Sequence, residues 1–204
     1  MSWLAVYRDD GPIARWLGRV LGPRYGMPAV VLLFVAALPL AVALAFGGAY
    51  LSEAALAPGV ATVVAFGGAS GGRPAGRFDW AVPSLLRVLE YGLLLWTAVL
   101  AHGWATRACF ALIAMLAYHH YDAVYRLRQQ AIAPPAWLSV AGAGWEGRVL
   151  LAYLALLLDV TAVGMAVAAG LLAVMFVGES VVWWLGVSRL QRGVVYADEE
   201  DEDE

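Results

Sequence analysis

Residues 28–50, with the sequence PAVVLLFVAALPLAVALAFGGAY, form an apolar run without a single charged side chain. A helix needs roughly 20 apolar residues to cross the hydrocarbon core of a bilayer, so this run predicts a transmembrane helix in which Pro39 is a tolerated kink. The composition of the whole chain agrees, because 62% of its 204 residues are hydrophobic and only 14% are charged. A soluble domain carries roughly 25% charged residues. The sequence therefore predicts an all-α integral membrane protein.

Further apolar segments predict about six crossings in total. Residues 54–69 are apolar but short, rich in Gly and Ala, and interrupted by Pro58, so they fit either a thin second span or a re-entrant segment. We expect a transmembrane domain over residues 28–190, between an N-terminal segment over 1–27 and a C-terminal segment over 191–204. The C-terminal segment ends in seven consecutive Asp and Glu residues and is predicted to be disordered. The other predicted spans cover residues 82–101, 103–120, 149–167 and 171–188.

The N-terminal segment carries an amphipathic pattern. Its apolar residues recur at helical spacing while Arg15 and Arg19 fall on another face, and Pro12 suits the first turn of a helix. This pattern indicates an amphipathic helix that lies in the membrane interface. The apolar residues of the pattern are Ile13, Trp16, Leu17, Val20 and Leu21.

The arginines predict the orientation of the chain. All 13 basic residues are arginine, and basic residues are enriched in short cytoplasmic loops. With six crossings and a cytoplasmic N-terminus, only Arg107 falls on the outer side, whereas a re-entrant segment at 54–69 would place Arg73 and Arg77 outside. We therefore expect a multi-pass protein of the inner (plasma) membrane with both termini in the cytoplasm.

Three carboxylates fall at membrane depth in this arrangement. At the helical rise per residue, Glu90 lies about 12 Å from the inner end of its predicted span and Asp159 lies about 16 Å into its span, near the midplane. Glu179 lies midway along the last span. Ionisable groups at such depth cost several kcal/mol unless they are paired or hydrated. They therefore predict either a polar site that binds cations or relays protons, or interhelical pairs with Arg or Tyr.

The densest group of polar residues is YHHYDAVYRLR at residues 118–128. In a helix, His119, Asp122 and Arg126 share one face, and Tyr118 lies at its edge. A carboxylate one turn from a histidine suits general acid–base catalysis or metal ligation, since imidazole titrates near neutral pH. The alternative is an interfacial belt of Tyr, His and Arg that carries no chemistry.

Arginines near the same predicted face favour an anionic ligand. A guanidinium group binds two phosphate oxygens at once, and Mg²⁺ or Mn²⁺ would join phosphate to carboxylates. The alternative is that these arginines attract anionic lipid electrostatically and take no part in catalysis. The candidates divide by role: catalytic, His119, Asp122 and Glu90; substrate- or phosphate-binding, Arg87, Arg126, Arg128, Arg148, Tyr118 and Tyr125; metal-ligating, Asp122, Asp159 and Glu90.

Four stretches carry a resemblance to known families: AYHHYDAVYRLR at 117–128, RDDGP at 8–12, FDWAVPSLLRVLEYG at 78–92 and WEGR at 145–148. With them the chain resembles, over nearly its whole length, an uncharacterised actinobacterial membrane domain that often follows sugar-phosphate nucleotidyltransferase or CDP-alcohol phosphatidyltransferase modules. That resemblance implies no catalytic residues. The six-span plan also resembles the CDP-alcohol phosphatidyltransferases in architecture alone, because their D-x2-D-G-x2-A-R and G-x3-D-x3-D patterns are missing from the sequence.

Taken together, the sequence predicts a protein that binds a phosphorylated or CDP-linked lipid precursor at its cytosolic face, as a head-group or phospho-group transferase of phospholipid biosynthesis. Two alternatives stay open: a non-catalytic anchor or assembly subunit for a cytosolic nucleotidyltransferase or CDP-alcohol transferase, and a small transporter. Small residues at Ala162, Ala166, Ala169 and Gly170 would allow close packing in a homo-oligomer. We expect no nucleic-acid partner, and the single cysteine, Cys109, excludes an intrachain disulfide.

Overall fold

The computed structural model describes residues 3–47, 50–73 and 76–202, and over these ranges the chain is helical without β-strands. Turns of 3-10 helix lie at Gly22–Arg24 and Asp79–Ala81. The α-helices are α1 (Trp3–Arg8), α2 (Pro12–Val20), α3 (Ala29–Phe46), α4 (Glu53–Ser70), α5 (Val82–Ala101), α6 (Ala105–Gln130), α7 (Ala136–Ala141), α8 (Gly144–Leu157) and α9 (Thr161–Glu202).

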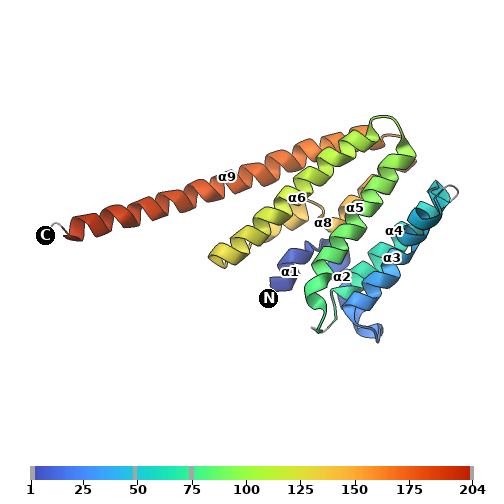
Figure 1. The fold of residues 1–204 in the computed structure, drawn as a ribbon, viewed down its shortest axis with the longest axis horizontal. Coiled ribbons are helices and arrows are strands. Elements are labelled where there is room, and N and C mark those ends of the chain that lie inside the picture. Colours follow the sequence, from blue (N-terminus) through green and yellow to red (C-terminus); the bar gives the residue numbers. More distant parts are fainter. Residues whose placement is uncertain (1–2, 48–49, 74–75, 203–204) are drawn as a thin grey trace.

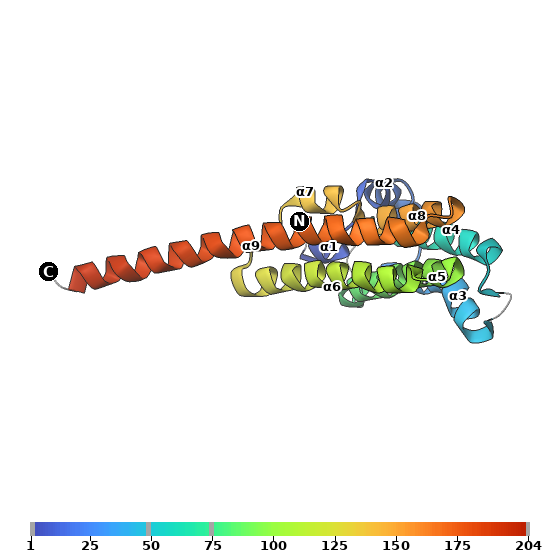
Figure 2. The same ribbon diagram turned by 90° about the horizontal axis from the view of Figure 1, so that it is seen from above.

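The long helices alternate in direction along the chain (Figure 1). The connections from α3 to α4, from α5 to α6 and from α8 to α9 lie at one end of the bundle. At the other end, which we call the α1 end, lie α1, α2, α7 and the residues at 71–73, 76–81 and 131–143 (Figures 1 and 2). Short connections between apolar helices enforce this up-and-down order.

Five segments are long and apolar enough to cross a membrane, which suggests a membrane protein. Helix α6 is not among them, since the polar residues at its two ends lower its hydropathy. Large apolar side chains such as Phe34, Leu44 and Val174 are exposed on the outside of the bundle, with relative exposures of 59%, 71% and 78%. Apolar surface of this kind is expected where lipid replaces water. The five segments are Ala29–Phe46, Glu53–Ser70, Asp79–Ala101, Ala136–Leu157 and Thr161–Gly186.

The short apolar stretch at 54–69 forms a continuous helix. Ser52 caps α4, since its side chain accepts a hydrogen bond from the Ala55 N–H at 3.3 Å. Pro58, in the second turn, cannot donate to the Ala54 carbonyl, but α4 continues through it to Ser70. Helix α4 packs along α3. Of the two alternatives for residues 54–69, the continuous helix therefore favours a span over a re-entrant segment.

The boundary between the last two predicted spans is wrong. We expected spans at 149–167 and 171–188, but α8 ends at Leu157 and α9 begins at Thr161. The break occurs at Asp159, which adopts the left-handed conformation with φ of +56°, a conformation that Asp tolerates better than most residues. Gly170 continues α9 without interruption. Asp159 is therefore exposed in a turn rather than near the middle of a span.

Helix α9 extends well beyond the other helices (Figures 1 and 2). It continues from Thr161 to Glu202. The expected boundary at residue 190, between the transmembrane domain and the C-terminal segment, therefore falls within a helix. The segment predicted to be disordered is helical as far as Glu202. The backbone reason is that no proline follows Thr161, and Glu is a good helix former.

Helix α2 confirms the predicted N-terminal helix, with Pro12 in its first turn. Its Ala14 and Gly18 are buried, whereas Ile13, Trp16 and Arg19 are exposed. Gly18 meets Gly72 beyond α4 so closely that a Cβ on Gly72 would lie 1.6 Å from the Gly18 carbonyl oxygen. Glycine is required at this contact, and the contact holds α2 against the end of α4.

Candidate functional site

A buried ion-pair network joins α1, α5 and α8 at the α1 end. Arg148 donates to Glu90 Oε1 at 2.7 Å through Nε and to Asp9 Oδ2 at 2.9 Å through a terminal nitrogen. Arg87 pairs with the other oxygen of Glu90 and also donates to the carbonyl of Arg8. We call these four side chains, Asp9, Arg87, Glu90 and Arg148, the Arg148 network. Two cations balance two carboxylates, as the burial of charge requires.

Asp9 is held in an unusual conformation at the end of α1. Its φ of +49° lies in the left-handed region, and its carbonyl accepts the Trp145 N–H at 3.2 Å. Burial alone would raise the pKa of Asp9, but Arg148, His120 and Arg87 together hold this pKa well below its usual range. Asp9 is therefore ionised at neutral pH. Its Oδ2 binds Arg148, whereas its Oδ1 is buried without a hydrogen-bond partner among the described residues.

The start of α8 holds the N-terminal segment in place. Glu146 accepts the backbone N–H groups of Gly11 and Ala14, each at 3.0 Å, and so caps α2 from a distant part of the chain. The Trp145 indole donates to Asp10 Oδ1 at 2.8 Å. Gly144 has φ of +60°, and a Cβ there would lie 2.3 Å from the Gly11 nitrogen. The RDDG and GWEGR stretches thus form one packed unit.

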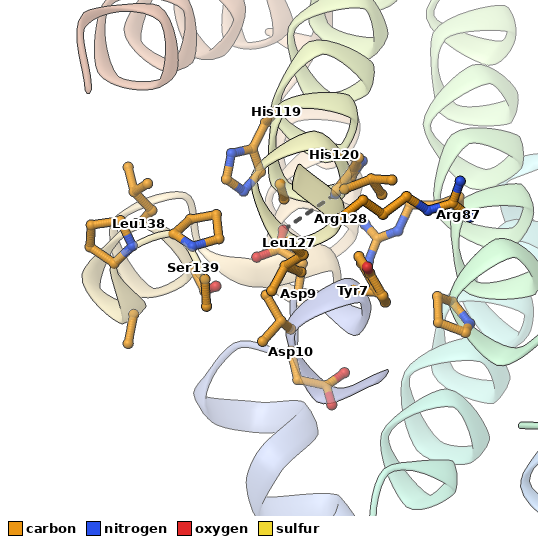
Figure 3. Close-up of a pocket in the computed structure, with 18 of the residues that line it drawn as sticks. Tyr7, Asp9, Asp10, Arg87, His119, His120, Leu127, Arg128, Leu138 and Ser139 are labelled. Carbon is orange, nitrogen blue, oxygen red and sulfur yellow. Dashed lines mark ion pairs between the residues drawn. The ribbon is translucent and has the colours of Figure 1, made fainter. Parts of the chain in front are cut away.

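A pocket of about 740 Å³ opens beside this unit, between α1, α5, α6 and the segment that leads to α7 (Figure 3). We call it the basic pocket. Residues from α1 and the connection to α2 form one wall, and the C-terminal part of α6 forms another. Its polar side chains are Tyr7, Asp9, Asp10, Arg15, Ser84, Arg87, His119, His120, Arg128 and Ser139, and its apolar side chains include Val6, Trp80, Pro83, Val124, Leu127 and Leu138.

The basic pocket contains two arginines without a carboxylate partner among the described residues, although Arg15 Nε donates to the Gly11 carbonyl at 3.1 Å. Arg15 and Arg128 are exposed, and no carboxylate of the described residues lies within ion-pair distance of either guanidinium group. Asp10 is neutralised by Arg8, which donates to it at 2.8 Å. Arg87 is occupied by Glu90 and the Arg8 carbonyl. The unpaired charge of the pocket is therefore positive.

Two histidines line the same pocket in different settings. The ring of His119 stacks on Phe176 of α9, with centroids 3.9 Å apart. His120 Nδ1 lies 2.9 Å from the Tyr91 hydroxyl, and its Nε2 lies 3.6 Å from Asp9 Oδ2, as the dashed line in Figure 3 marks. His120 is thus oriented by Tyr91 towards Asp9, and the ring of His119 is held by aromatic packing.

A second ion-pair cluster lies between α6 and α9. Arg126 donates to both oxygens of Glu179, at 2.9 and 2.8 Å, and pairs with Asp122 at 2.7 Å. Asp122 Oδ1 also accepts from Ser180 and Trp184, at 3.1 and 3.2 Å. We call these side chains, Asp122, Arg126, Glu179, Ser180 and Trp184, the Arg126 clamp. Arg126 is only 1% exposed, so the clamp holds two helices together.

The structure separates the site residues that the sequence predicted as one group. His119, Asp122 and Arg126 share the buried face of α6, as expected. Asp122 and Arg126 nevertheless belong to the clamp, and Glu90 and Arg148 belong to the buried network, because the carboxylates and arginines of each cluster neutralise one another. Of the predicted residues, only His119, Arg87 and Arg128 line the basic pocket.

The remaining predicted residues lie elsewhere. Asp159 is exposed in the turn before α9, at the opposite end of the bundle. Tyr118 is partly buried against the core, and Tyr125 packs against Trp184 and Tyr121. Asp159 is therefore far from the other proposed metal ligands. Over the described part of the chain, no group of three or more His, Cys, Asp or Glu side chains is arranged to hold a metal ion.

The pocket is also lined by Asp9, Asp10 and Arg15, for which the sequence predicted no role in binding or catalysis. One signal could have found them. The RDDG stretch places three consecutive charged residues directly before a glycine and an amphipathic helix. The arginine of the WEGR stretch, Arg148, offers a countercharge elsewhere in the chain. The spacing of the RDDG and WEGR stretches in the sequence does not predict that they are in contact.

A comparison with protein-family models matches residues 1–200 to a family of unknown function, DUF5941. No curated protein and no solved structure matches the chain.

Proposed function

We propose that this chain, which belongs to the family of unknown function DUF5941, is an integral membrane protein that binds the phosphate-bearing head group of a lipid or of a CDP-linked lipid precursor. The basic pocket is the binding site. The observation that carries this proposal is the pair of exposed arginines, Arg15 and Arg128, which lack a carboxylate partner among the described residues and line a cavity of about 740 Å³.

The position of the pocket supports a lipid ligand. It lies at the α1 end of apolar helices, where the polar head group of a lipid would lie if those helices cross a bilayer. Its wall combines arginines with apolar side chains such as Trp80, Val124 and Leu127. A guanidinium group binds phosphate oxygens, and the apolar wall suits the glycerol backbone and the first methylenes of a lipid.

The distribution of arginines supports a cytoplasmic location for this end. Arg15, Arg24, Arg77 and Arg128 lie at the α1 end, whereas Arg107 lies in the first turn of α6, near the other end. Basic residues accumulate on the cytoplasmic side of multi-pass proteins. We therefore propose that α6 is a sixth crossing, that the membrane is the inner (plasma) membrane, and that both termini are cytoplasmic.

Head-group or phospho-group transfer at this site would use His119, whose ring lines the pocket near the free arginines. A neutral imidazole accepts a proton from an attacking hydroxyl, and the arginines stabilise the charge of the phosphate. Glu90 and Asp122 are occupied by arginines, so neither is part of this proposal as a base. A divalent ion, Mg²⁺ or Mn²⁺, would enter with the phosphate of the ligand rather than bind to a preformed cluster.

A second function is favoured by a separate observation, the projection of α9 beyond the bundle. A helix that leaves the membrane domain and ends in an acidic sequence would anchor a cytosolic nucleotidyltransferase or CDP-alcohol transferase. Removal of residues 191–204 would then abolish co-purification of such an enzyme and leave lipid binding unchanged. Unchanged co-purification would contradict this second function.

The lipid-binding proposal is tested by native mass spectrometry of the gently solubilised full chain. We expect phosphate-bearing lipid to remain bound, and we expect Arg128→Ala to weaken its retention about tenfold, since a charge-assisted hydrogen bond contributes on the order of one power of ten. Arg107→Ala, an exposed arginine on the same helix, is the matched control and should retain lipid normally. Equal retention by both variants would overturn the proposal.

A further inference from the structure

The carboxylate of Asp9 has one oxygen whose role the fold does not explain. Asp9 is 3% exposed, and its Oδ2 is bound by Arg148 at 2.9 Å. Its Oδ1 is buried and has no hydrogen-bond partner among the described residues, although Asp9 lines the basic pocket. Leaving a buried charged acceptor unpaired is unfavourable. Since Asp9 lines the cavity, a donor supplied by a ligand would complete the hydrogen bonds of this carboxylate.

The orientation of this carboxylate is fixed from three sides. The Trp145 N–H holds the Asp9 carbonyl, Arg148 holds Oδ2, and His120 Nε2 lies 3.6 Å from the same oxygen. The His120 ring is in turn positioned by the Tyr91 hydroxyl at 2.9 Å. A carboxylate oriented in this way before the ligand arrives binds a donor with little further loss of freedom.

The charges around Asp9 select the kind of donor. Arg148 and Arg87 already balance Asp9 and Glu90, and Arg15 and Arg128 add positive charge to the pocket without a described carboxylate partner. A cationic amine would enter a pocket whose unpaired charge is already positive. A neutral hydroxyl group would not meet this repulsion. The remaining polar side chains of the wall, Tyr7, Ser84 and Ser139, also suit hydroxyl groups.

We propose that the basic pocket recognises a polyol phosphate head group, with the phosphate bound by Arg15 and Arg128 and an adjacent hydroxyl group donating to Asp9 Oδ1. This inference rests on the proposed lipid-binding function and adds the class of head group. It excludes cationic head groups such as ethanolamine and choline as preferred ligands.

The test compares three lipids that share acyl chains. Phosphatidylglycerol and phosphatidylmethanol both carry one phosphodiester charge, but only the former has free hydroxyl groups, whereas phosphatidylethanolamine adds an amine. Each lipid is titrated onto the delipidated full chain in detergent and measured by native mass spectrometry. We expect phosphatidylglycerol to bind about tenfold more tightly than phosphatidylmethanol, because a hydrogen bond to a charged acceptor is worth roughly one power of ten in affinity. Phosphatidylethanolamine should bind most weakly.

Variants then connect this preference to Asp9. Asp9→Asn keeps the shape of the side chain but lowers the strength of the acceptor, so it should reduce the preference for phosphatidylglycerol to about twofold. Asp9→Glu keeps the charge that pairs with Arg148 while displacing the oxygens, and it serves if the Asn variant does not fold. Arg128→Ala should weaken phosphatidylglycerol and phosphatidylmethanol equally, which leaves their ratio unchanged.

The outcomes separate the two proposals. Equal affinity for phosphatidylglycerol and phosphatidylmethanol, with both weakened by Arg128→Ala, would overturn the polyol inference and leave the lipid-binding function intact. Tighter binding of phosphatidylethanolamine would also overturn it, because Asp9 would then bind an ammonium group. If both Asp9 variants kept the preference for phosphatidylglycerol over phosphatidylmethanol, the hydroxyl group would bind a residue other than Asp9 and the inference would be wrong. Binding that does not depend on Arg128 would remove the lipid-binding function itself.

Discussion

Arg148 illustrates how a residue that looks like a ligand-binding cation serves the fold. The residue is 6% exposed, and its guanidinium group lies between Asp9 of the α1 end and Glu90 of α5. Burial of each charge is tolerated because the other is beside it. The carboxylate that the sequence placed at membrane depth, Glu90, is thus compensated within the protein, and its depth is not by itself a sign of catalysis.

Replacing Arg148 by Met should destabilise the protein strongly. The variant leaves Asp9 without its closest cation and removes one of the two arginines on Glu90. Breaking a buried ion pair in this way costs about 3–5 kcal/mol. The free energy of unfolding, measured in detergent with a chemical denaturant, should fall by this amount.

Arg107→Met is the control for this prediction. Arg107 is exposed at the start of α6, and substitutions of exposed residues change stability by less than about 0.5 kcal/mol. If Arg148→Met were as stable as the control and had instead lost its lipid, Arg148 would be a phosphate ligand, as the sequence analysis predicted.

At the scale of the helices, the contact between the α1 end and α8 depends on a glycine. Gly144 has φ of +60°, and its missing Cβ leaves room for the Gly11 nitrogen. Gly144→Ala should therefore displace the N-terminal segment and lower the unfolding free energy by about 1–3 kcal/mol, from a strained backbone and an overpacked contact. Limited proteolysis near residues 9–11 should become faster.

Gly170→Ala provides the matched comparison within α9. Apart from the adjacent backbone of α9, no atom lies within 4 Å of the position that its Cβ would occupy, and alanine favours helix more than glycine does. This variant should be unchanged or slightly more stable. Equal behaviour of the two variants would show that the contact between Gly144 and Gly11 contributes little to stability.

The Arg126 clamp makes a second prediction about helices. Asp122→Asn removes one of the two carboxylates on Arg126 but keeps an oxygen that accepts from Ser180. We expect α9 to loosen from α6, with faster hydrogen exchange over residues 172–186, and lipid retention to stay within twofold. Arg128→Ala should show the reverse, normal exchange and lost lipid. Loss of lipid in Asp122→Asn without faster hydrogen exchange would indicate that Asp122 binds the ligand, as the sequence predicted.

The helices were largely predictable from the sequence, whereas the partners of the buried charges were not. Hydropathy located α3, α5 and most of α6, because a long apolar run reports directly on a buried or lipid-facing helix. It misplaced the break before α9, since Leu158, Asp159 and Val160 lack the Gly or Pro that normally marks a turn. The two partners of Arg148 lie 58 and 139 residues away, and local spacing carries no information about such pairs.

At the scale of the whole molecule, the arrangement of helices and the arginines favours six crossings over five. The five segments with sufficient length and hydropathy do not include α6. Helix α6 nevertheless runs antiparallel to α5 and packs along α9, so it lies within the same bundle as helices that are apolar enough to cross. Its charged side chains Asp122 and Arg126 are paired, which lowers the cost of keeping this helix beside the bilayer.

Cysteine labelling distinguishes the two topologies. Cys109 is fully buried, so it gives little background when single cysteines replace Arg77, His102 or Asp159, which are all exposed. Six crossings place residues 102 and 159 outside and residue 77 in the cytoplasm. A membrane-impermeant maleimide should then label His102→Cys and Asp159→Cys in intact cells, and Arg77→Cys only after permeabilisation.

If α6 did not cross, residue 102 would still be outside, but residue 159 would be in the cytoplasm. Protection of Asp159→Cys together with labelling of His102→Cys would therefore contradict the sixth crossing. The pocket residues of α6 and α7 would then not lie in the cytoplasm.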